Sequence, residues 1–166
     1  MSSGSVSLAI SKLKLLQQNL SEVNRVFIQK SLDYIELQAM LHLEETTGNG
    51  SYIPTGQLMS SFIKENDGTI GNLINTCFYS ALVEYGTGIR GVGTYEGTLP
   101  EGYKYDVNSH GERGWVYMGT DGQFHWTDGM PAHNFMFRAL NDYLYSTEYK
   151  RLFSEAFNEV CGGVFK

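Results

Sequence analysis

The stretch Tyr79-Ser-Ala-Leu-Val-Glu-Tyr-Gly-Thr-Gly88 places a short amphipathic segment directly before a turn bracketed by glycines. Its apolar residues share one side of a helix, and Gly86 stands where a helix C-cap favours a left-handed residue. A second stretch, Gly129-Met-Pro-Ala-His-Asn-Phe-Met136, predicts a turn that begins a helix with Asn134 as its cap. Neither stretch has an active-site signature. Both therefore predict packing and assembly.

A long amphipathic helix is expected over 1–47. Between Val6 and Glu45 there is neither proline nor glycine. Apolar residues recur there at steps of three and four, namely Leu13, Leu16, Leu20, Val23 and Phe27. An intramolecular core is the favoured partner of this stripe, and packing between subunits of a ring is the alternative.

Turn signals divide the rest of the chain. Asp-Gly pairs near 67 and 121 predict two hairpins, and a glycine-rich stretch between them predicts a long irregular loop. The expected elements are strands and a short helix over 52–87, an extended loop over 88–114, a hairpin over 115–127 and a C-terminal helix over 134–160. The predicted fold is a single α+β domain over 1–166. Its long N-terminal helix and C-terminal helix would pack on a small, mostly antiparallel sheet.

Composition narrows the classes of function. The chain has 166 residues, of which 42% are hydrophobic and 13% aromatic, so one core and a surface suited to protein partners are expected. A net charge of −6 disfavours DNA gripping, whereas acidic walls suit a channel through which DNA passes. Cys77 and Cys161 are too few for a disulfide scaffold or a thiolate zinc cluster. No targeting or membrane-spanning segment is expected, which favours synthesis in the cytoplasm.

The best case for an enzyme is a cluster of histidines and carboxylates that could bind zinc. Its members are His110, His125 and His133, with Asp106, Glu112 and Asp128. The spacing lacks a His-Glu-x-x-His motif, and the glycines of 86–93 lack the lysine of a P-loop. We therefore expect no catalytic residue, metal or cofactor.

Three prominent residues each have two interpretations. Glu84 could pair with Arg90 or Arg113, or could lie on a solvated helix face, and the solvated face is favoured. Trp115 and Trp126 could stack on a sugar or base, but alternating aromatics on a hairpin more often pack in a core or an interface. Core or interface is the expected place of both tryptophans.

The order of several segments resembles a family of bacteriophage neck and minor tail proteins, named after gene product ten of a lambdoid long-tailed phage. The segments that carry the resemblance are Pro54-Thr-Gly-Gln-Leu58, the stretch 79–88, the stretch 131–140, Tyr105-Asp-Val-Asn-Ser-His-Gly-Glu-Arg-Gly-Trp115 and Phe124-His-Trp-Thr-Asp-Gly-Met-Pro131. The chain departs from the family where Pro54 and Thr55 are adjacent, where Met59 replaces a basic residue, and where Asn134 replaces a second proline.

This resemblance implies an α+β protein that forms a ring, hexameric in the virion, at the head-proximal end of the tail. The implied partners are further copies, head-completion proteins and tail-tube or tail-terminator proteins, with DNA passing through the lumen and no membrane involved. The candidate assembly and turn residues are Pro54, Thr55, Gly56, Leu58, Tyr79, Glu84, Tyr85, Gly86, Thr87, Gly88, Trp115, Trp126, Pro131 and Phe135. A metal-dependent hydrolase and a generic protein-binding adaptor remain the alternatives.

Overall fold

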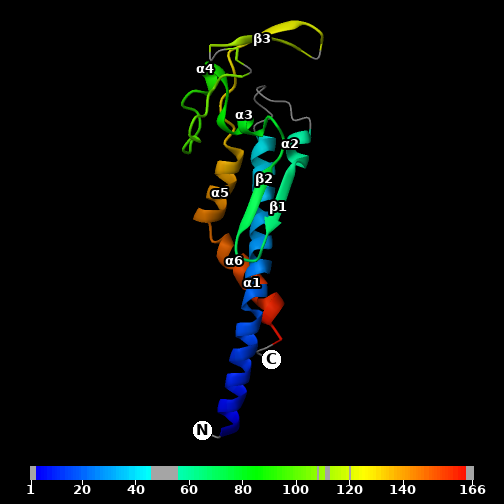
Figure 1. Ribbon diagram of the computed structural model, residues 1–166, viewed down its shortest axis with the longest axis vertical. Helices are drawn as coiled ribbons and strands as arrows, with labels where there is room; N and C mark the ends of the chain where they lie inside the picture. The colour runs from blue at the N-terminus through cyan, green and yellow to red at the C-terminus, as the bar shows by residue number, and fades with distance from the viewer. Residues whose placement is uncertain (1–2, 46–55, 108, 111–112, 120, 164–166) are drawn as a thin grey trace.

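The computed structural model describes residues 3–45, 56–107, 109–110, 113–119 and 121–163 (Figure 1). The fold is α+β, as predicted. In chain order the elements are α1 (Ser3–Glu45), α2 (Gln57–Ser60), β1 (Phe62–Asn66), β2 (Gly71–Asn75), α3 (Ser80–Tyr85), α4 (Gly88–Gly91), β3 (Trp115–Met118), β4 (Phe124–Thr127), α5 (Phe135–Tyr145) and α6 (Glu148–Cys161).

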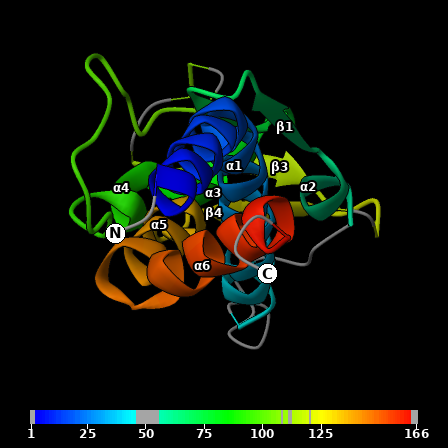
Figure 2. The ribbon, with the colours of Figure 1, turned by 90° about the horizontal axis from the view of Figure 1, so that it is seen from below.

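Helix α1 is the axis of the molecule and confirms the predicted long helix. Its 43 residues give it a length of about 65 Å at the usual helical rise. Helices α5 and α6 pack along one side of α1, and the β1–β2 hairpin lies on another side (Figures 1 and 2). The elements that follow α1 in sequence therefore pack against its C-terminal half, from about Val23 onward.

The β1–β2 hairpin is antiparallel, with Phe62 opposite Asn75. Its loop spans 67–70, where the Asp67 carboxylate accepts the N–H groups of two following residues at 2.7 Å each. Lys64 reaches from β1 to the carboxylates of Asp33 and Glu36 on α1, at 2.7 and 2.6 Å. These ion pairs hold the exposed edge of the hairpin against the helix.

The prediction of one small sheet was wrong, because the four described strands form two separate two-stranded sheets. The second hairpin, β3–β4, confirms the predicted hairpin over 115–127, with Trp115 opposite Thr127. It extends beyond α3 at the far end of the molecule from the N-terminus (Figure 1). The two hairpins are separated by the 88–114 stretch and pack on different elements, which is why their strands do not join.

The prediction of one C-terminal helix over 134–160 was also wrong. The helix is interrupted at Ser146, whose backbone is extended (φ −89°, ψ 179°). The Ser146 hydroxyl then accepts the Glu148 N–H at 3.1 Å and starts α6 in a new direction. The kink lets both helices follow α1.

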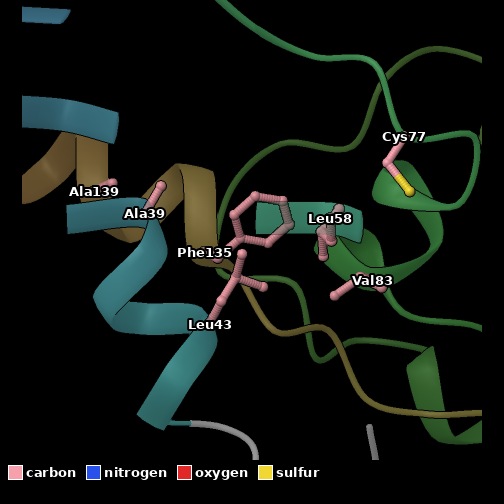
Figure 3. Packing of buried hydrophobic residues seen from close by; sticks show 7 residues of the cluster. All are labelled: Ala39, Leu43, Leu58, Cys77, Val83, Phe135 and Ala139. Atoms are coloured by element: carbon pink, nitrogen blue, oxygen red, sulfur yellow. The ribbon is translucent and has the colours of Figure 1, made fainter. Parts of the chain in front are cut away.

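A hydrophobic core joins α1, α2, α3 and α5 (Figure 3). Its members are Ala39, Leu43, Leu58, Cys77, Val83, Phe135 and Ala139. Phe135, the first residue of α5, is completely buried and meets the Phe62 ring edge-on at a centroid distance of 6.4 Å. The core therefore forms where the stretch 79–88 and the start of α5 converge on the C-terminal end of α1.

The stretch 88–114, predicted to be an extended irregular loop, begins with the helical turn α4 and is held to its own chain. Thr94 Oγ1 accepts the Ala132 N–H at 2.7 Å, and Glu96 forms an ion pair with Arg138. Tyr103 Oη donates to the carbonyl oxygen of Gly86 at 2.6 Å. These contacts hold the described part of the stretch against the rest of the chain.

Candidate interaction site

The two stretches that dominate the sequence cross each other and pair through their backbones. Thr87 N–H donates to Met130 O at 2.8 Å, and Met130 N–H donates to Thr87 O at 3.0 Å. At this crossing Gly88 and Gly129 have positive φ values of 60° and 97°, and a Cβ on either would collide with the opposite backbone. The close approach therefore requires glycine at both positions. We call this crossing of residues 86–88 and 129–131 the joint.

Glu84 caps the N-terminus of α5 from the neighbouring helix α3. It is 5% exposed, and its two carboxylate oxygens accept the N–H groups of Met136 and Phe137 at 2.9 and 3.0 Å. These donors belong to the first helical turn, which has no partner within its own helix. The favoured interpretation of Glu84, a solvated helix face, was therefore wrong, because its carboxylate is buried. Arg90 instead lies 3.9 Å from Asp128.

The environment of Glu84 also changes its titration. Burial raises the pKa of the Glu84 carboxyl above its usual value, and this effect exceeds the lowering by the N–H bonds from Met136 and Phe137. The Tyr95 hydroxyl is hydrogen bonded to the carboxylate, and burial, followed by the charge of Glu84, raises the pKa of Tyr95 to about 12. Tyr95 therefore remains a neutral donor to this buried acid.

Asn134 occupies the predicted N-cap position of α5 but does not cap it with its side chain. Its backbone is left-handed (φ 57°, ψ 26°). Its Oδ1 accepts the Glu96 N–H at 2.7 Å, and its Nδ2 donates to the Thr94 and Ala132 carbonyls at 3.3 and 3.2 Å. The side chain is directed to the 88–114 stretch because Glu84 already satisfies the donors of the helix.

Most other predicted assembly residues belong to this joint. Gly86 ends α3 with a positive φ of 82°, as expected, although its ψ of 168° is extended rather than left-handed helical. Tyr85 meets the rings of Tyr95 and Tyr103 edge-on at 4.9 and 5.0 Å. Leu58 and Phe135 are core residues, Tyr79 and Pro131 are half-buried beside them, and Gly56 is exposed. Pro54 and Thr55 lie outside the described residues.

The histidines of the alternative metal site lie in different parts of the structure and have different neighbours. His125 bonds to Asp121 at 3.0 Å on the exposed hairpin, and His110 is exposed in the preceding stretch. His133 is buried in the joint, where burial and then Arg138 lower its pKa. Among the described residues, no three His, Cys, Asp or Glu side chains lie close enough to share a metal ion. Glu112 lies outside the described residues.

The β3–β4 hairpin exposes large apolar side chains. We call the four that share one side of the hairpin the hairpin face: Val116, Met118, Phe124 and Trp126. Phe124 is 77% exposed and Trp126 is 66% exposed, while the partly buried Trp115 faces α3. Contiguous apolar surface of this kind marks a site of interaction with other molecules. Trp126 is therefore not a core residue of this chain, and Trp115 is only half-buried. A place for both tryptophans in an interface stays a prediction.

Two further apolar surfaces are uncovered in the structure. The N-terminal part of α1, residues 6–21, extends away from the other elements, and we call it the arm (Figure 1). A groove of about 560 Å³ lies between α1, β2 and α5. Its apolar lining includes Leu32, Ile35, Leu73, Ile74 and Leu140. Periodicity predicted the apolar stripe of the arm but not that its own chain would leave it uncovered, and the groove had no local signal in the sequence.

No described helix has the length and hydrophobicity needed to cross a lipid bilayer. No protein-family model, curated protein or solved structure matches this chain.

Proposed function

We propose that this chain is a structural protein of a long-tailed bacteriophage that forms part of the junction between head and tail. It acts by assembly, in a ring of copies that also contacts neighbouring head-completion and tail proteins. The observation that carries the proposal is the exposure of large apolar side chains on two elements at opposite ends of the molecule, the arm and the hairpin face. Surfaces at opposite ends suit a subunit with neighbours on several sides.

The joint supports this proposal in a second way. The segments that carry the resemblance to neck proteins, 79–88 and 131–140, meet in the joint through main-chain pairing and the Glu84 cap. Their residues are occupied with holding α3, α5 and the hairpin at fixed angles.

The charge of the chain is consistent with a channel for DNA. Eighteen acidic residues against twelve basic residues repel a phosphate backbone on average. A ring with this charge lets DNA pass without holding it, because phosphate contacts by Lys and Arg dominate non-specific binding.

Deletion of the gene from the phage that carries it tests the proposal by electron microscopy of the lysate. We expect DNA-filled heads separate from tails, or tails of abnormal length, and we expect infectivity to return when the gene is supplied in trans. Free heads would indicate a joining role, and abnormal tails a role in length termination. Intact infectious particles without the protein would reject the proposal.

Point variants in the same complementation assay locate the function on the surface. The hairpin variant has both Phe124 and Trp126 changed to serine, which removes the two most exposed aromatic side chains of the hairpin face. We expect this double variant not to restore infectivity. Tyr145→Ser is a matched control, since Tyr145 is 86% exposed but lies at the end of α5, away from the hairpin. Full complementation by the hairpin variant would remove this face from the proposal.

A further inference from the structure

We propose that the arm of one copy docks in the groove of a second copy, so that copies join head to tail. The inference deepens the proposed function and rests on it in one respect, that the chain works as repeated copies. It assigns the surfaces through which those copies contact each other.

The arm has an apolar stripe that its own chain leaves uncovered. Leu13 and Leu20 are 64% and 50% exposed, and Leu16 lies between them on the same side of the helix. The stripe continues into the body at Val23, which is fully buried, and at Phe27, whose ring meets Phe153 of α6 at 5.5 Å. The same stripe is therefore covered by α6 in the body and ends uncovered in the arm.

The arm lacks the tertiary packing that stabilises the rest of α1. Packing of an apolar face supplies most helical stability in proteins. None of residues 6–21 is buried. A partner that covers the Leu13–Leu20 stripe would supply the missing stabilisation.

The groove has the chemistry to accept such a stripe. Apolar side chains of α1, β2 and α5 line most of it, and Ile74 and Leu140 remain 40% and 45% exposed at its walls. Leu13, Leu16 and Leu20 follow the i, i+3, i+7 spacing with which an amphipathic helix anchors in an apolar groove. The volume of about 560 Å³ admits several such side chains.

A chain cannot place its arm in its own groove. Leu32 and Ile35 of α1 form part of the groove lining, and the arm is the direct N-terminal continuation of the same helix. Folding back would require α1 to break within the body, where Val23 and Leu32 are buried. The arm must therefore reach a groove in another copy.

Charge favours this occupant over the alternatives. Residues 1–21 contain Lys12 and Lys14 and no acidic residue, so the remaining chain has ten basic and eighteen acidic residues, a net charge of −8. A basic arm is attracted to this acidic body. Pairing of two arms would instead bring their lysines together. Two lysines are also fewer than the clusters of about four to eight that bind anionic lipid surfaces.

The geometry makes the contact heterologous, since each copy offers an arm and accepts another at a different surface. Repetition of such a contact gives a ring if the rotation closes and a filament if it does not. Ring closure is what the proposed place at the head–tail junction needs.

Sedimentation velocity of the purified full-length protein over a range of concentrations tests the contact. We expect wild type to self-associate. An arm variant with both Leu13 and Leu20 changed to glutamine, and a groove variant, Leu140→Arg, should each associate at least about tenfold more weakly. The matched controls are Leu15→Gln, on the opposite face of the arm, and Leu144→Arg, on α5 outside the groove lining. Both should associate like wild type.

Mixing the two variants tests the head-to-tail arrangement. The groove variant keeps its arm and the arm variant keeps its groove, so the mixture should form a dimer that neither variant forms alone. Reversing the charges of Lys12 and Lys14 to glutamate should weaken wild-type association, whereas Lys104→Glu, at an exposed position in the body, should not. Circular dichroism of each variant verifies that the helices are retained.

Several results would overturn the inference. They are a wild type that remains monomeric at every concentration, association that survives in the groove variant but not in the arm variant, and binding of the arm to anionic vesicles without self-association. The second would mean that arms pair with each other. The assay uses purified protein alone, so its failure leaves the phage deletion result standing, and failure of the deletion test leaves the association result standing.

Discussion

Glu84 shows how one residue connects distant parts of the chain. A carboxylate on α3 accepts N–H groups at the start of α5, some fifty positions later in sequence. Because helix N-termini favour negative charge and the donors there lack helical partners, the contact stabilises the crossing of the two segments. Burial opposes ionisation of the same group, so its contribution depends on pH.

Replacing Glu84 with alanine should lower the free energy of unfolding by about 2 kcal/mol at pH 7, since two buried N–H donors lose their acceptor. Urea unfolding followed by circular dichroism measures the change. Glu101→Ala, in an exposed turn, is the control and should stay within about 0.5 kcal/mol of wild type. An equal effect of both substitutions would show that the cap contributes nothing to stability.

The cost of the Glu84→Ala substitution should increase as the pH is lowered from 7 toward 4.5. The pKa of Glu84 in the folded state is raised above the usual 4.5, so the folded state binds the proton more tightly than the unfolded state. Binding of this proton stabilises the folded wild-type protein. That stabilisation is complete below the pKa that Glu84 has in the unfolded chain, and it is lost as the pH rises through the pKa that Glu84 has in the folded state. Urea unfolding of both proteins at several pH values measures the difference. A cost that instead grows with pH would mean that the N–H bonds outweigh burial.

At the scale of elements, the backbone crossing fixes the angle between α3 and α5. Gly88 and Gly129 allow the segments to approach closely, and the Thr87–Met130 pairing then closes the contact. Side chains of the 88–114 stretch pack over this contact, which is why a segment with so many glycines is ordered where the structure describes it.

Gly129→Ala should destabilise the protein by about 3 kcal/mol, because the added Cβ meets the Thr87 carbonyl and the positive φ of 97° disfavours any side chain. Thermal or urea unfolding provides the measurement. Gly93→Ala separates the two causes, since Gly93 also has a positive φ, 72°, but open space around it. We expect a loss of about 1 kcal/mol for Gly93→Ala. Similar losses at both glycines would mean that backbone angle alone, and not close approach, explains the crossing.

The elements also show how far the sequence predicted the fold. The long helix, the two hairpins, the short helix before Gly86 and the start of α5 were predicted from periodicity and turn chemistry. The break at Ser146 was missed because the apolar pattern continues across it, and serine is a weak signal for the end of a helix. The Glu84 cap was missed because its donors lie far away in sequence.

At the scale of the whole molecule, the distribution of burial along α1 is uneven. Its C-terminal part holds the core together, whereas the arm contacts little of its own chain. Local stability follows the number of buried contacts, so these two parts of one continuous helix should differ in stability. That difference suits an element that completes its packing in an assembly.

Hydrogen exchange should reveal this difference. In dilute protein, amides of residues 6–21 should exchange at least about tenfold faster than those of residues 27–43, because no tertiary packing protects the arm. At concentrations where copies associate, the arm amides should slow while those of residues 27–43 change little. Mass spectrometry of peptides from quenched samples gives both rates. Equal protection of both parts in dilute protein would contradict the uneven stability.

The sequence by itself determined the α+β class, the acidic charge, the helix of α1, both hairpins and the turn positions, because these depend on residue spacing and local backbone preference. The tertiary structure decided that Glu84 is a buried cap, that the described strands form two sheets, that the candidate metal histidines lie far from one another, and that the arm and groove are uncovered. These outcomes depend on which distant segments become neighbours. Periodicity along a chain specifies which side of an element is apolar, but only packing specifies what covers that side.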